Sequence, residues 1–426
     1  MTLTRDDCAA LDRADPLAPL REQFHVPEGL VYLDGNSLGP LPRTAPARVA
    51  EVMEQEWGQG LIRSWNSAGW MTLPQRVGDK IARLVGAGPG ELVVADSTSV
   101  NLYKALSAAL QLATESADAA PARRVIVSER DNFPTDLYMA ESLAREHGGR
   151  LELLDAADIP ARLADGNGHD VAILLLTHVN FRTGRIHDMA ALTQAAHAAG
   201  ALTVWDLAHT AGALPVDLTA AQADFAVGCG YKYLNGGPGA PAFVWVRPAL
   251  VNRTSQPLAG WIGHAAPFEF TPGYRPAAGI ARYLCGTPPI LAVAALECGV
   301  DTVLAAESLG GMAALRAKSL ELTRLFARLV RERCAGHGLR IVSPDEDARR
   351  GSQVSLARDE GAYAIVRALI ERGVIGDFRA PDVLRFGFTP LYLRHVDVWD
   401  AAEQLREVLD SGQWREPRFH QRQQVT

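Results

Sequence analysis

The sequence predicts an α/β protein that combines a large, mostly parallel, doubly wound sheet with a smaller α/β unit. From about residue 74 to 247, short apolar segments alternate with helical ones, which is the element order of a doubly wound sheet. The segment 171–176 is apolar throughout, as expected for a strand buried on both faces of a parallel sheet. At 426 residues the chain is long enough for two to three domains.

The large domain is expected at 66–289. Its strands are predicted at 92–95, 125–128, 171–176, 203–206 and 224–228, and 243–246 is the closing strand, parallel or antiparallel. Helices are predicted at 74–85, from about 98 onward, at 188–199 and, as a short element, between 206 and 224.

The smaller domain is expected to combine an N-terminal segment, 1–65, with residues 290–426. The N-terminal segment contributes a strand at 31–33 and a helix at about 43–59. After a long helix at about 290–335, strands are predicted at 339–342, 353–356, 374–378 and 383–387, with helices at 362–372 and 396–411. This order is typical of an α/β sandwich, which the N-terminal segment would complete.

Composition excludes several functional classes. The hydrophobic content of 48% and charged content of 21% are those of an ordinary globular protein, and the net charge of −7 argues against nucleic acid as a partner. No apolar run approaches the ~18 residues that a membrane span needs, and the first residues lack the apolar core of a secretory signal. The five cysteines are scattered without a C-x-x-C pair. We therefore expect no disulfide framework, no metal site and a cytoplasmic location.

The segment 203–239 carries the strongest chemical signal. Lys232 follows an apolar strand and is flanked by glycines, whose backbone can approach a ligand closely. A lysine in a dry pocket loses proton affinity and becomes a nucleophile able to form a Schiff base. Asp206 ends a predicted parallel strand, where it could pair with a pyridinium nitrogen, and His209 follows it. Taken alone, Lys232 is typical of a surface lysine after a strand, and Asp206 is typical of a helix cap. Together with His209 and the glycines, they indicate pyridoxal phosphate (PLP).

Two other segments could contact such a cofactor. Ser97 and Thr98 begin a predicted helix whose N-terminus can hold a phosphate, although a plain N-cap is the commoner use of these residues. In the sequence F-P-T-D, Pro134 keeps Phe133 out of helical geometry, so that its ring could lie flat on a planar cofactor. Without a cofactor, the same sequence reads as an ordinary helix start, with Asp136 near the cap.

The remaining candidates lie outside these strands. Asn36 and Ser37 read as turn residues, and Trp65 reads as a core or interface residue that could also face an aromatic substrate. The irregular stretch 258–290, which contains Trp261 and Thr287, is too long to be a mere linker. Arg385 interrupts an apolar strand. Alternation usually places such an arginine on the solvent face, yet its planar fork suits a substrate carboxylate.

Several motifs resemble those of fold-type I PLP-dependent enzymes of the class V aminotransferase type, and most closely those of the kynureninase family. They are Y-L-D-G-N-S-L-G, F-P-T-D, D-L-A-H, G-Y-K-Y-L-N-G-G-P-G, W-x-G-H and the segment before P-P-I, and they occur in the family's order between about residues 30 and 395. The resemblance implies the fold-type I PLP-dependent transferase-like fold. It also implies a homodimer whose active sites are shared across the interface.

The resemblance assigns roles to individual residues. Lys232 would hold the cofactor and move the Cα proton, and Asp206 would hold the pyridine nitrogen protonated. The other cofactor contacts would come from Ser97, Thr98, Phe133, Asp136, His209 and Tyr231, with Trp261 and Thr287 supplied by the partner chain. Many relatives have Asn where this chain has Thr287, which is still a hydrogen-bond donor. Arg385 would bind the substrate carboxylate, with Asn36, Ser37 and Trp65 near the substrate, and Tyr231 is also a candidate acid or base.

The implied reaction is hydrolysis of L-kynurenine, and also of L-3-hydroxykynurenine, to anthranilate or 3-hydroxyanthranilate and L-alanine in tryptophan catabolism. A second enzyme of the same fold, a class V aminotransferase or a cysteine desulfurase, is an alternative. A desulfurase needs a reactive cysteine on a mobile loop, and none of the five cysteines lies in an obvious one. A non-catalytic binding protein is a further alternative, but buried Lys232, Asp206 and Arg385 would each cost stability without a ligand.

Overall fold

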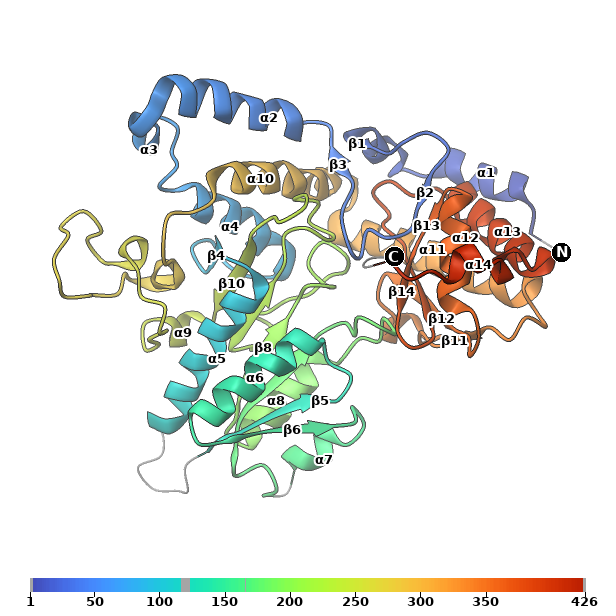
Figure 1. Cartoon of the computed structure of the whole chain (residues 1–426). Coiled ribbons are helices and arrows are strands. Elements are labelled where there is room, and N and C mark those ends of the chain that lie inside the picture. Colours follow the sequence, from blue (N-terminus) through green and yellow to red (C-terminus); the bar gives the residue numbers. More distant parts are fainter. Residues whose placement is uncertain (1–2, 116–122, 165, 424–426) are drawn as a thin grey trace.

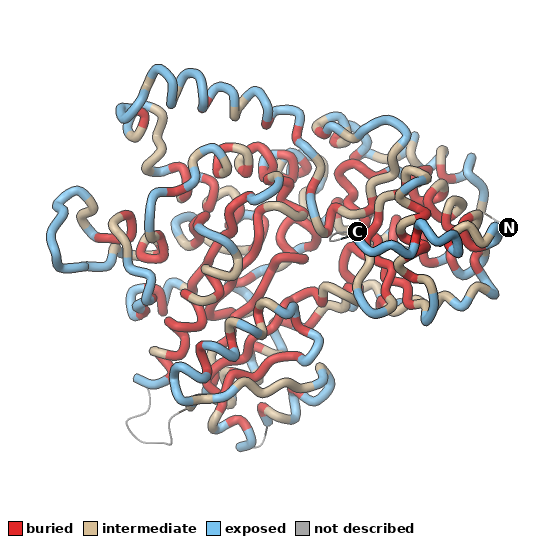
Figure 2. The backbone as a smooth tube through the Cα atoms, viewed as in Figure 1, coloured by how far each residue is buried: buried red, intermediate tan, exposed pale blue. Residues whose placement is uncertain are grey.

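The structure, a computed structural model, describes residues 3–115, 123–164 and 166–423. It consists of a large unit built on a seven-stranded sheet and a small unit built on a four-stranded sheet (Figure 1). Both ends of the described chain, α1 (Arg5–Ala14) and α14 (Pro417–His420), lie on the small unit. The central strands of both sheets form the buried interior, whereas the edge strands β6 and β11 contain no buried residue (Figure 2).

The seven-stranded sheet has the strand order β4-β10-β9-β8-β7-β5-β6. Its strands are β4 (Leu92–Ala95), β5 (Val125–Glu129), β6 (Arg150–Leu154), β7 (Val171–Thr177), β8 (Leu202–Asp206), β9 (Phe225–Gly228) and β10 (Ala242–Val246). The pairs among β6, β5, β7, β8 and β9 are all parallel, which confirms the predicted sheet. The prediction that 243–246 closes the sheet is wrong, because β10 lies between β4 and β9 and is antiparallel to both.

Helices cover both faces of this sheet, as the doubly wound order requires. α5 (Thr98–Glu115) and α6 (Pro134–Glu146) pack on one face, and α4 (Leu73–Val85), α8 (Met189–Ala198) and α10 (Ile290–Leu304) pack on the other. In β10, Val244 and Val246 belong to the α5 side, whereas Phe243 and Trp245 belong to the opposite side, following the two-residue period of a strand. The short helices α7 (Ile159–Leu163) and α9 (Pro248–Val251) lie in connections.

The small unit joins the two ends of the chain. Its four strands, β11 (Arg340–Ile341), β12 (Gln353–Ala357), β15 (Val383–Gly387) and β14 (Asp377–Arg379), are antiparallel in that order. The packed helices are α11 (Gly311–Arg333), α12 (Ala362–Glu371), α13 (His395–Ser411) and α1. From the N-terminal segment, β2 (Val31–Tyr32) pairs in parallel with β13 (Val374–Ile375), and β1 (Phe24–His25) pairs with β3 (Leu41–Pro42). The domain boundaries at 65 and 289 stay predictions.

Three predicted helices differ from the observed ones. The helix expected at 43–59 begins as α2 (Ala45–Glu51) but continues as a π-helix, Val52–Gly60. A short helix, α3 (Ser64–Ser67), follows further along the chain. The long helix at 290–335 is broken because Gly310 adopts a positive φ of 101°, which separates α10 from α11. The short helix expected between β8 and β9 is wrong, since the chain there forms turns.

Helix α10 lies close against the chain that carries Lys232. A Cβ atom on Gly299 would come 2.3 Å from the carbonyl oxygen of Leu234 and 2.5 Å from that of Asn235. The side-chain amide of Asn235 in turn donates to the hydroxyl of Thr302 on α10. Only a glycine therefore lets the helix support this loop at the observed distance.

We predict that Gly299→Ala destabilises the protein by about 1–3 kcal/mol, because the methyl group meets backbone atoms that cannot turn aside. This is the net loss of folding stability, after the gain of ~1 kcal/mol that alanine gives over glycine through helix propensity. Denaturant unfolding measures the effect. Gly273→Ala is the control, since a Cβ there meets nothing within 4 Å. Equal stability of the two variants would contradict the close approach.

Candidate active site

A pocket opens at the carboxyl ends of the parallel strands. It is lined by Thr98, Ser99, Phe133, Thr135, Asp136, Thr177, Phe181, Asp206, Ala208, His209, Tyr231 and Lys232. Asp206 is the last residue of β8 and Thr177 the last of β7, while Lys232 follows β9. The carboxyl ends of parallel strands meet at one edge of a sheet, which is where ligands of open α/β folds bind. Seven residues predicted for the cofactor site lie in this one pocket.

Lys232 lies at the centre of this group. Its Nζ is 3.0 Å from Nε2 of His209, 5.7 Å from the ring centroid of Phe133 and 5.8 Å from that of Tyr231. The loop that carries it is fixed by its own backbone, because the amide of Asn235 donates to the carbonyl of Lys232 over 2.9 Å. The amine is therefore held among aromatic and imidazole groups.

Asp206 and Asp136 form a buried carboxyl pair next to the lysine. Burial raises the pKa of Asp206, although the charge of Lys232 acts against this, and the amide of Ala208 donates to Oδ1 over 2.6 Å. Burial raises the pKa of Asp136 well above its usual range, and the neighbouring Asp206 raises it further. The pair is therefore arranged to hold one proton, with the charge on Asp206, where a cationic N–H group would find an acceptor.

His209 is neutral and incompletely bonded. Burial lowers its pKa well below the usual value, and the positive charge of Lys232 adds to this. Its Nε2 faces Lys232, and its buried Nδ1 has no hydrogen-bond partner among the described residues. Buried polar atoms are seldom left unpaired in native proteins, so this nitrogen is a candidate to bond to a group bound in the pocket.

The residues predicted for the phosphate end lie in different places. The hydroxyl of Ser97 accepts from the amide of Val100 over 3.3 Å, which is the capping role, and Ser97 does not line the pocket. Thr98 and Ser99 do line it, at the start of the 18-residue helix α5. The helix N-terminus and two hydroxyl groups are suited to an anion.

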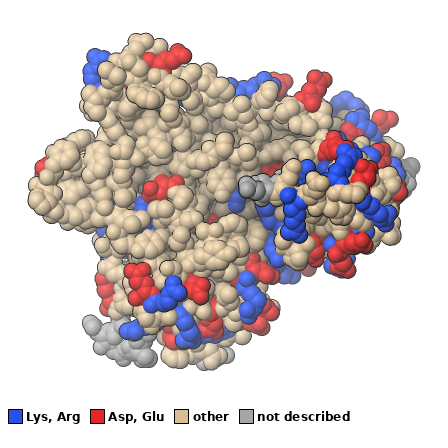
Figure 3. All heavy atoms as spheres, in the orientation of Figure 1, with Lys and Arg blue, Asp and Glu red and all other residues tan. Residues whose placement is uncertain are grey.

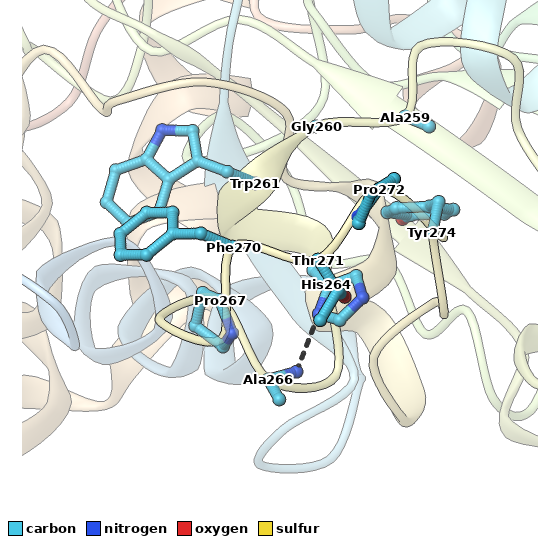
Figure 4. A pocket seen from close by; sticks show the side chains of 10 residues that line it. All are labelled: Ala259, Gly260, Trp261, His264, Ala266, Pro267, Phe270, Thr271, Pro272 and Tyr274. Carbon is cyan, nitrogen blue, oxygen red and sulfur yellow. Dashed lines mark hydrogen bonds between the residues drawn. The ribbon is translucent and has the colours of Figure 1, made fainter.

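Trp261, Trp65 and Thr287 lie outside this pocket. Trp261 lines a separate cavity of about 410 Å³ with His264, Phe270, Tyr274 and six further residues (Figure 4). The ring of Trp65 stands edge-on to that of Trp261, with centroids 6.1 Å apart. Thr287 is exposed. None of these three residues is brought to Lys232 within one chain.

Arg385, Ser37 and Asn36 form part of a second group beside the pocket. Arg385 is 1% exposed, so the expectation that strand alternation places it toward solvent is wrong. Its guanidinium binds both carboxylate oxygens of Asp377, and it donates to the hydroxyl of Ser37 over 2.7 Å. It also donates to the carbonyl of Phe181, whose side chain lines the pocket. Asn36 is buried, and neither atom of its amide group has a hydrogen-bond partner among the described residues.

Sequence reasoning missed several residues of both groups. Thr177 and Phe181 line the pocket, and Asp377 and Arg379 complete the second group. The position of Thr177 at a strand's carboxyl end was a usable signal, as was the D-x-R spacing, which puts two charges on one face of a strand. Phe181 lies in a turn and carried no such signal.

The residues present fit PLP. They supply an amine, a proton-sharing carboxyl pair for a ring nitrogen, an unpaired histidine nitrogen, and a phenyl ring that is 39% exposed. They also supply hydroxyl groups at a helix N-terminus for a phosphate. These are the features that the cofactor's ring, its substituents and its phosphate each require.

Solved structures share this fold. A cysteine desulfurase from Thermococcus onnurineus aligns with a TM-score of 0.77 at 18% identity, covering 92% of this chain and 98% of that one. A variant of C-DES with glycine covalently linked to its PLP cofactor aligns with a TM-score of 0.78 at 16% identity, covering 91% and 99%. The chain therefore has the fold of fold-type I PLP-dependent enzymes, and its pocket has groups that fit PLP.

Sequence comparison is more specific. A kynureninase from Pseudomonas fluorescens is 55% identical over 425 residues, or 99% of this chain and 100% of the relative. One from Burkholderia pseudomallei is 55% identical over 423 residues, with the same coverage. The family model "Kynureninase C-terminal domain" matches residues 315–405. This chain therefore belongs to the kynureninase family and is a PLP-dependent hydrolase.

We predict a pH-dependent loss of stability from a buried histidine next to the site. Burial lowers the pKa of His178 to about 4, with the nearby His187 adding to the effect, and Nδ1 lies 3.0 Å from the hydroxyl of Thr210. The unfolded chain binds a proton below the usual pKa of 6.5, whereas the folded chain does so only near 4. The stabilisation is therefore present above pH 6.5, and about 3 kcal/mol is lost as pH falls toward 4.

Urea unfolding of wild type and His178→Asn between pH 8 and pH 4 measures this contribution. The variant keeps a polar atom for Thr210 and should show a shallower loss of stability with acid. His147→Asn is the control, because this exposed side chain is solvated in both states. Parallel pH profiles for wild type and His178→Asn would refute the assignment.

Proposed function

We propose that the Lys232 pocket is where this chain hydrolyses the Cβ–Cγ bond of L-kynurenine, and of L-3-hydroxykynurenine, to an anthranilate and L-alanine. The observation that carries the proposal is the placement of Lys232 between His209 and the Asp206–Asp136 pair at the carboxyl ends of the strands. Bound PLP supplies an electron sink, which makes the Cα proton acidic and prepares the Cβ–Cγ bond for cleavage.

The protein's residues divide the remaining work. Lys232 would hold the cofactor covalently and, when free, move the Cα proton, since its amine lies at the centre of the pocket. The Asp206 carboxylate, backed by the protonated Asp136, would keep the ring nitrogen protonated. Phe133 would cover the ring, and Nδ1 of His209 would bond to a ring substituent.

The phosphate end and the proton transfers involve Thr98 and Tyr231. Thr98, at the start of α5, would bind the phosphate in place of the capping Ser97. Burial raises the pKa of Tyr231, so its phenol stays protonated and can donate a proton near the cleaved bond. Arg385 would bind the α-carboxylate beside Ser37 and Asn36, and Trp65 would face the substrate ring.

We further propose a homodimer in which each site is completed by the other chain. The face that carries α2, the π-helix and the loop 258–290 holds few charged side chains (Figure 3), and it exposes Met53, Trp57, Leu61, Ile62, Phe268, Phe270 and Leu291. Exposed apolar patches of this kind mark interaction surfaces. Trp261 and Thr287 belong to this face, from which they would reach the partner's phosphate site. The cytoplasmic location stays a prediction; no helix in the described ranges has the length and apolar character to span a membrane.

A desulfurase reaction is not favoured. Among the described residues, four of the five cysteines are buried. Cys229 lies nearest the lysine in sequence, and burial raises the pKa of its thiol, which disfavours the thiolate that sulfur transfer requires.

We predict that Lys232→Ala loses at least ~10³-fold in the rate of forming both anthranilate and L-alanine, because the covalent anchor and the base are removed together. Anthranilate fluorescence and an alanine assay measure this loss. Lys80→Ala is the control, since Lys80 forms salt bridges with Glu297 and Asp301 away from the pocket. Undiminished product formation by the Lys232 variant would sink the assignment.

The shared site can be tested by mixing two inactive variants, Lys232→Ala and the double variant Trp261→Ala/Thr287→Ala. In a mixed dimer, one site would combine the intact Lys232 of one chain with the intact Trp261 and Thr287 of the other. After unfolding and refolding together, random pairing should restore about a quarter of wild-type activity. Failure to restore any activity, with mixed dimers demonstrated by differential tagging, would mean that each site is built within one chain.

A further inference from the structure

The group beside the pocket contains a second arginine. Asp377 and Arg379 lie two apart on β14, so their side chains share a face, and Asp377 is the register partner of Arg385 on β15. Nη2 of Arg379 is 2.7 Å from Oδ2 of Asp377, the same oxygen that Arg385 binds. One carboxylate therefore holds two guanidinium groups side by side.

Arg385 is nearly saturated by the protein itself. Every nitrogen of its guanidinium has a partner, namely the Asp377 carboxylate, the Ser37 hydroxyl and the Phe181 carbonyl. Its side chain is 1% exposed. A guanidinium has five N–H groups, and these four bonds leave Arg385 only one on Nη1. Arg385 alone could not make a two-bond contact with a carboxylate without giving up an existing bond.

Arg379 is the more available cation. Its side chain is 34% exposed, and Nη2 carries its two short contacts, to Asp377 and, over 3.2 Å, to Ser37. Nη1 makes only a 3.4 Å contact with the carbonyl of the adjacent Phe378, and Nε makes no hydrogen bond within the described ranges. The free edge of the guanidinium thus presents unused donors in the fork geometry that matches a carboxylate.

The charges of the group also favour an anion. Two arginines share Asp377, whose pKa is held below its usual value by Arg385 despite burial. Burial raises the pKa of the neighbouring Asp34 to about 7, and Asp377 adds to this, so Asp34 is partly neutral near pH 7. Arg385 donates to the carbonyl of Phe181, whose side chain lines the pocket, so the group borders the pocket. The pKa of His209, which is lowered mainly by burial and by Lys232, is lowered further by both arginines.

We propose that Arg379 is a second binding residue for the α-carboxylate of the substrate, held next to Arg385 by the shared carboxylate of Asp377. This inference rests on the proposed function, because it requires an amino-acid substrate bound at the Lys232 pocket. In this arrangement Arg379 offers its open edge, Arg385 contributes its remaining N–H group, and the substrate's negative charge neutralises the excess positive charge.

The test compares ligands with and without a carboxylate. The PLP-loaded wild type, Arg379→Gln, Arg379→Lys and Arg340→Gln are titrated with L-alanine and with ethylamine, which is alanine without its carboxylate, and binding is followed by visible absorption of the cofactor. Arg340 is the matched control because it is an exposed arginine on the same small sheet, paired with Asp359. KM and kcat for L-kynurenine are measured in parallel.

Arg379→Gln should weaken alanine binding about tenfold or more, the loss expected for a charged hydrogen bond. Ethylamine binding should be unchanged, and KM for kynurenine should rise while kcat changes little. Arg379→Lys should lose several-fold, since it keeps the charge without the fork. Arg340→Gln should match the wild type.

The proposal is overturned if Arg379→Gln binds alanine like the wild type, or if it loses alanine and ethylamine equally, which would indicate general damage to the site. Should Arg379→Gln not fold, Arg379→Lys decides, and wild-type affinity for alanine in that variant overturns the proposal. The proposed function fails separately, if the wild type forms no anthranilate or L-alanine from kynurenine.

Discussion

The active-site pocket depends on a small set of buried charges that must stay compensated. Asp206 and Asp136 lie at the carboxyl edge of the large sheet, where burial raises the pKa of both, and Lys232 supplies the nearest positive charge. Removing one partner from such a group leaves an uncompensated buried charge, which typically costs several kcal/mol. The parallel strands β7, β8 and β9 make the arrangement possible because their ends converge at one edge. Keeping a carboxylate charged in this buried pocket is therefore unfavourable, and a cationic ring nitrogen next to Asp206 would stabilise that charge.

The N-terminal segment 33–39 connects this pocket to the small unit. The amide of Gly39 donates to the carbonyl of Tyr231, directly before Lys232, while the amide of Leu33 donates to Ile375 and its carbonyl accepts from Gly387. Between these anchors, the hydroxyl of Ser37 reaches Arg385 and Asp377. Seven residues thus fix the distance between the amine of Lys232 and the arginines proposed to bind the substrate. The sequence of segment 33–39 indicated only a turn, but in the structure this segment connects the Lys232 loop to the small unit.

The sequence was most informative where the signal is local. Lys232, Asp206 and His209 lie within one strand–turn–strand stretch, so the local pattern indicated a site there. Thr98 and Phe133 come a few residues after strands, and the family resemblance added Asp136. Sequence analysis was less successful where the structure depends on pairing between strands that are distant in the sequence. The strand expected at 374–378 is divided, because β13 pairs with β2 and β14 pairs with β15. Because of that division, the sequence did not indicate that Arg379 lies on a strand beside Arg385. Nothing in the local sequence indicated that Asp377 would bind Arg385 in the protein interior. Whether β10 lies inside the sheet or at its edge is likewise decided by distant strands.

The tie between the chain's two ends has a consequence for biosynthesis. The Lys232 pocket is lined by residues 98–232, which leave the ribosome well before the C-terminal strands. The arginine group, by contrast, combines Ser37 from the start of the chain with Asp377 and Arg385 from near its end. Domains fold as units while the chain emerges from the ribosome. Segment 33–39 is therefore synthesised long before the strands that carry Asp377 and Arg385, and until then Ser37 lacks these hydrogen-bond partners. A product truncated before β14 would keep the residues that line the Lys232 pocket but would lack Asp377, Arg379 and Arg385. The proposed carboxylate site can therefore form only after translation has passed residue 385.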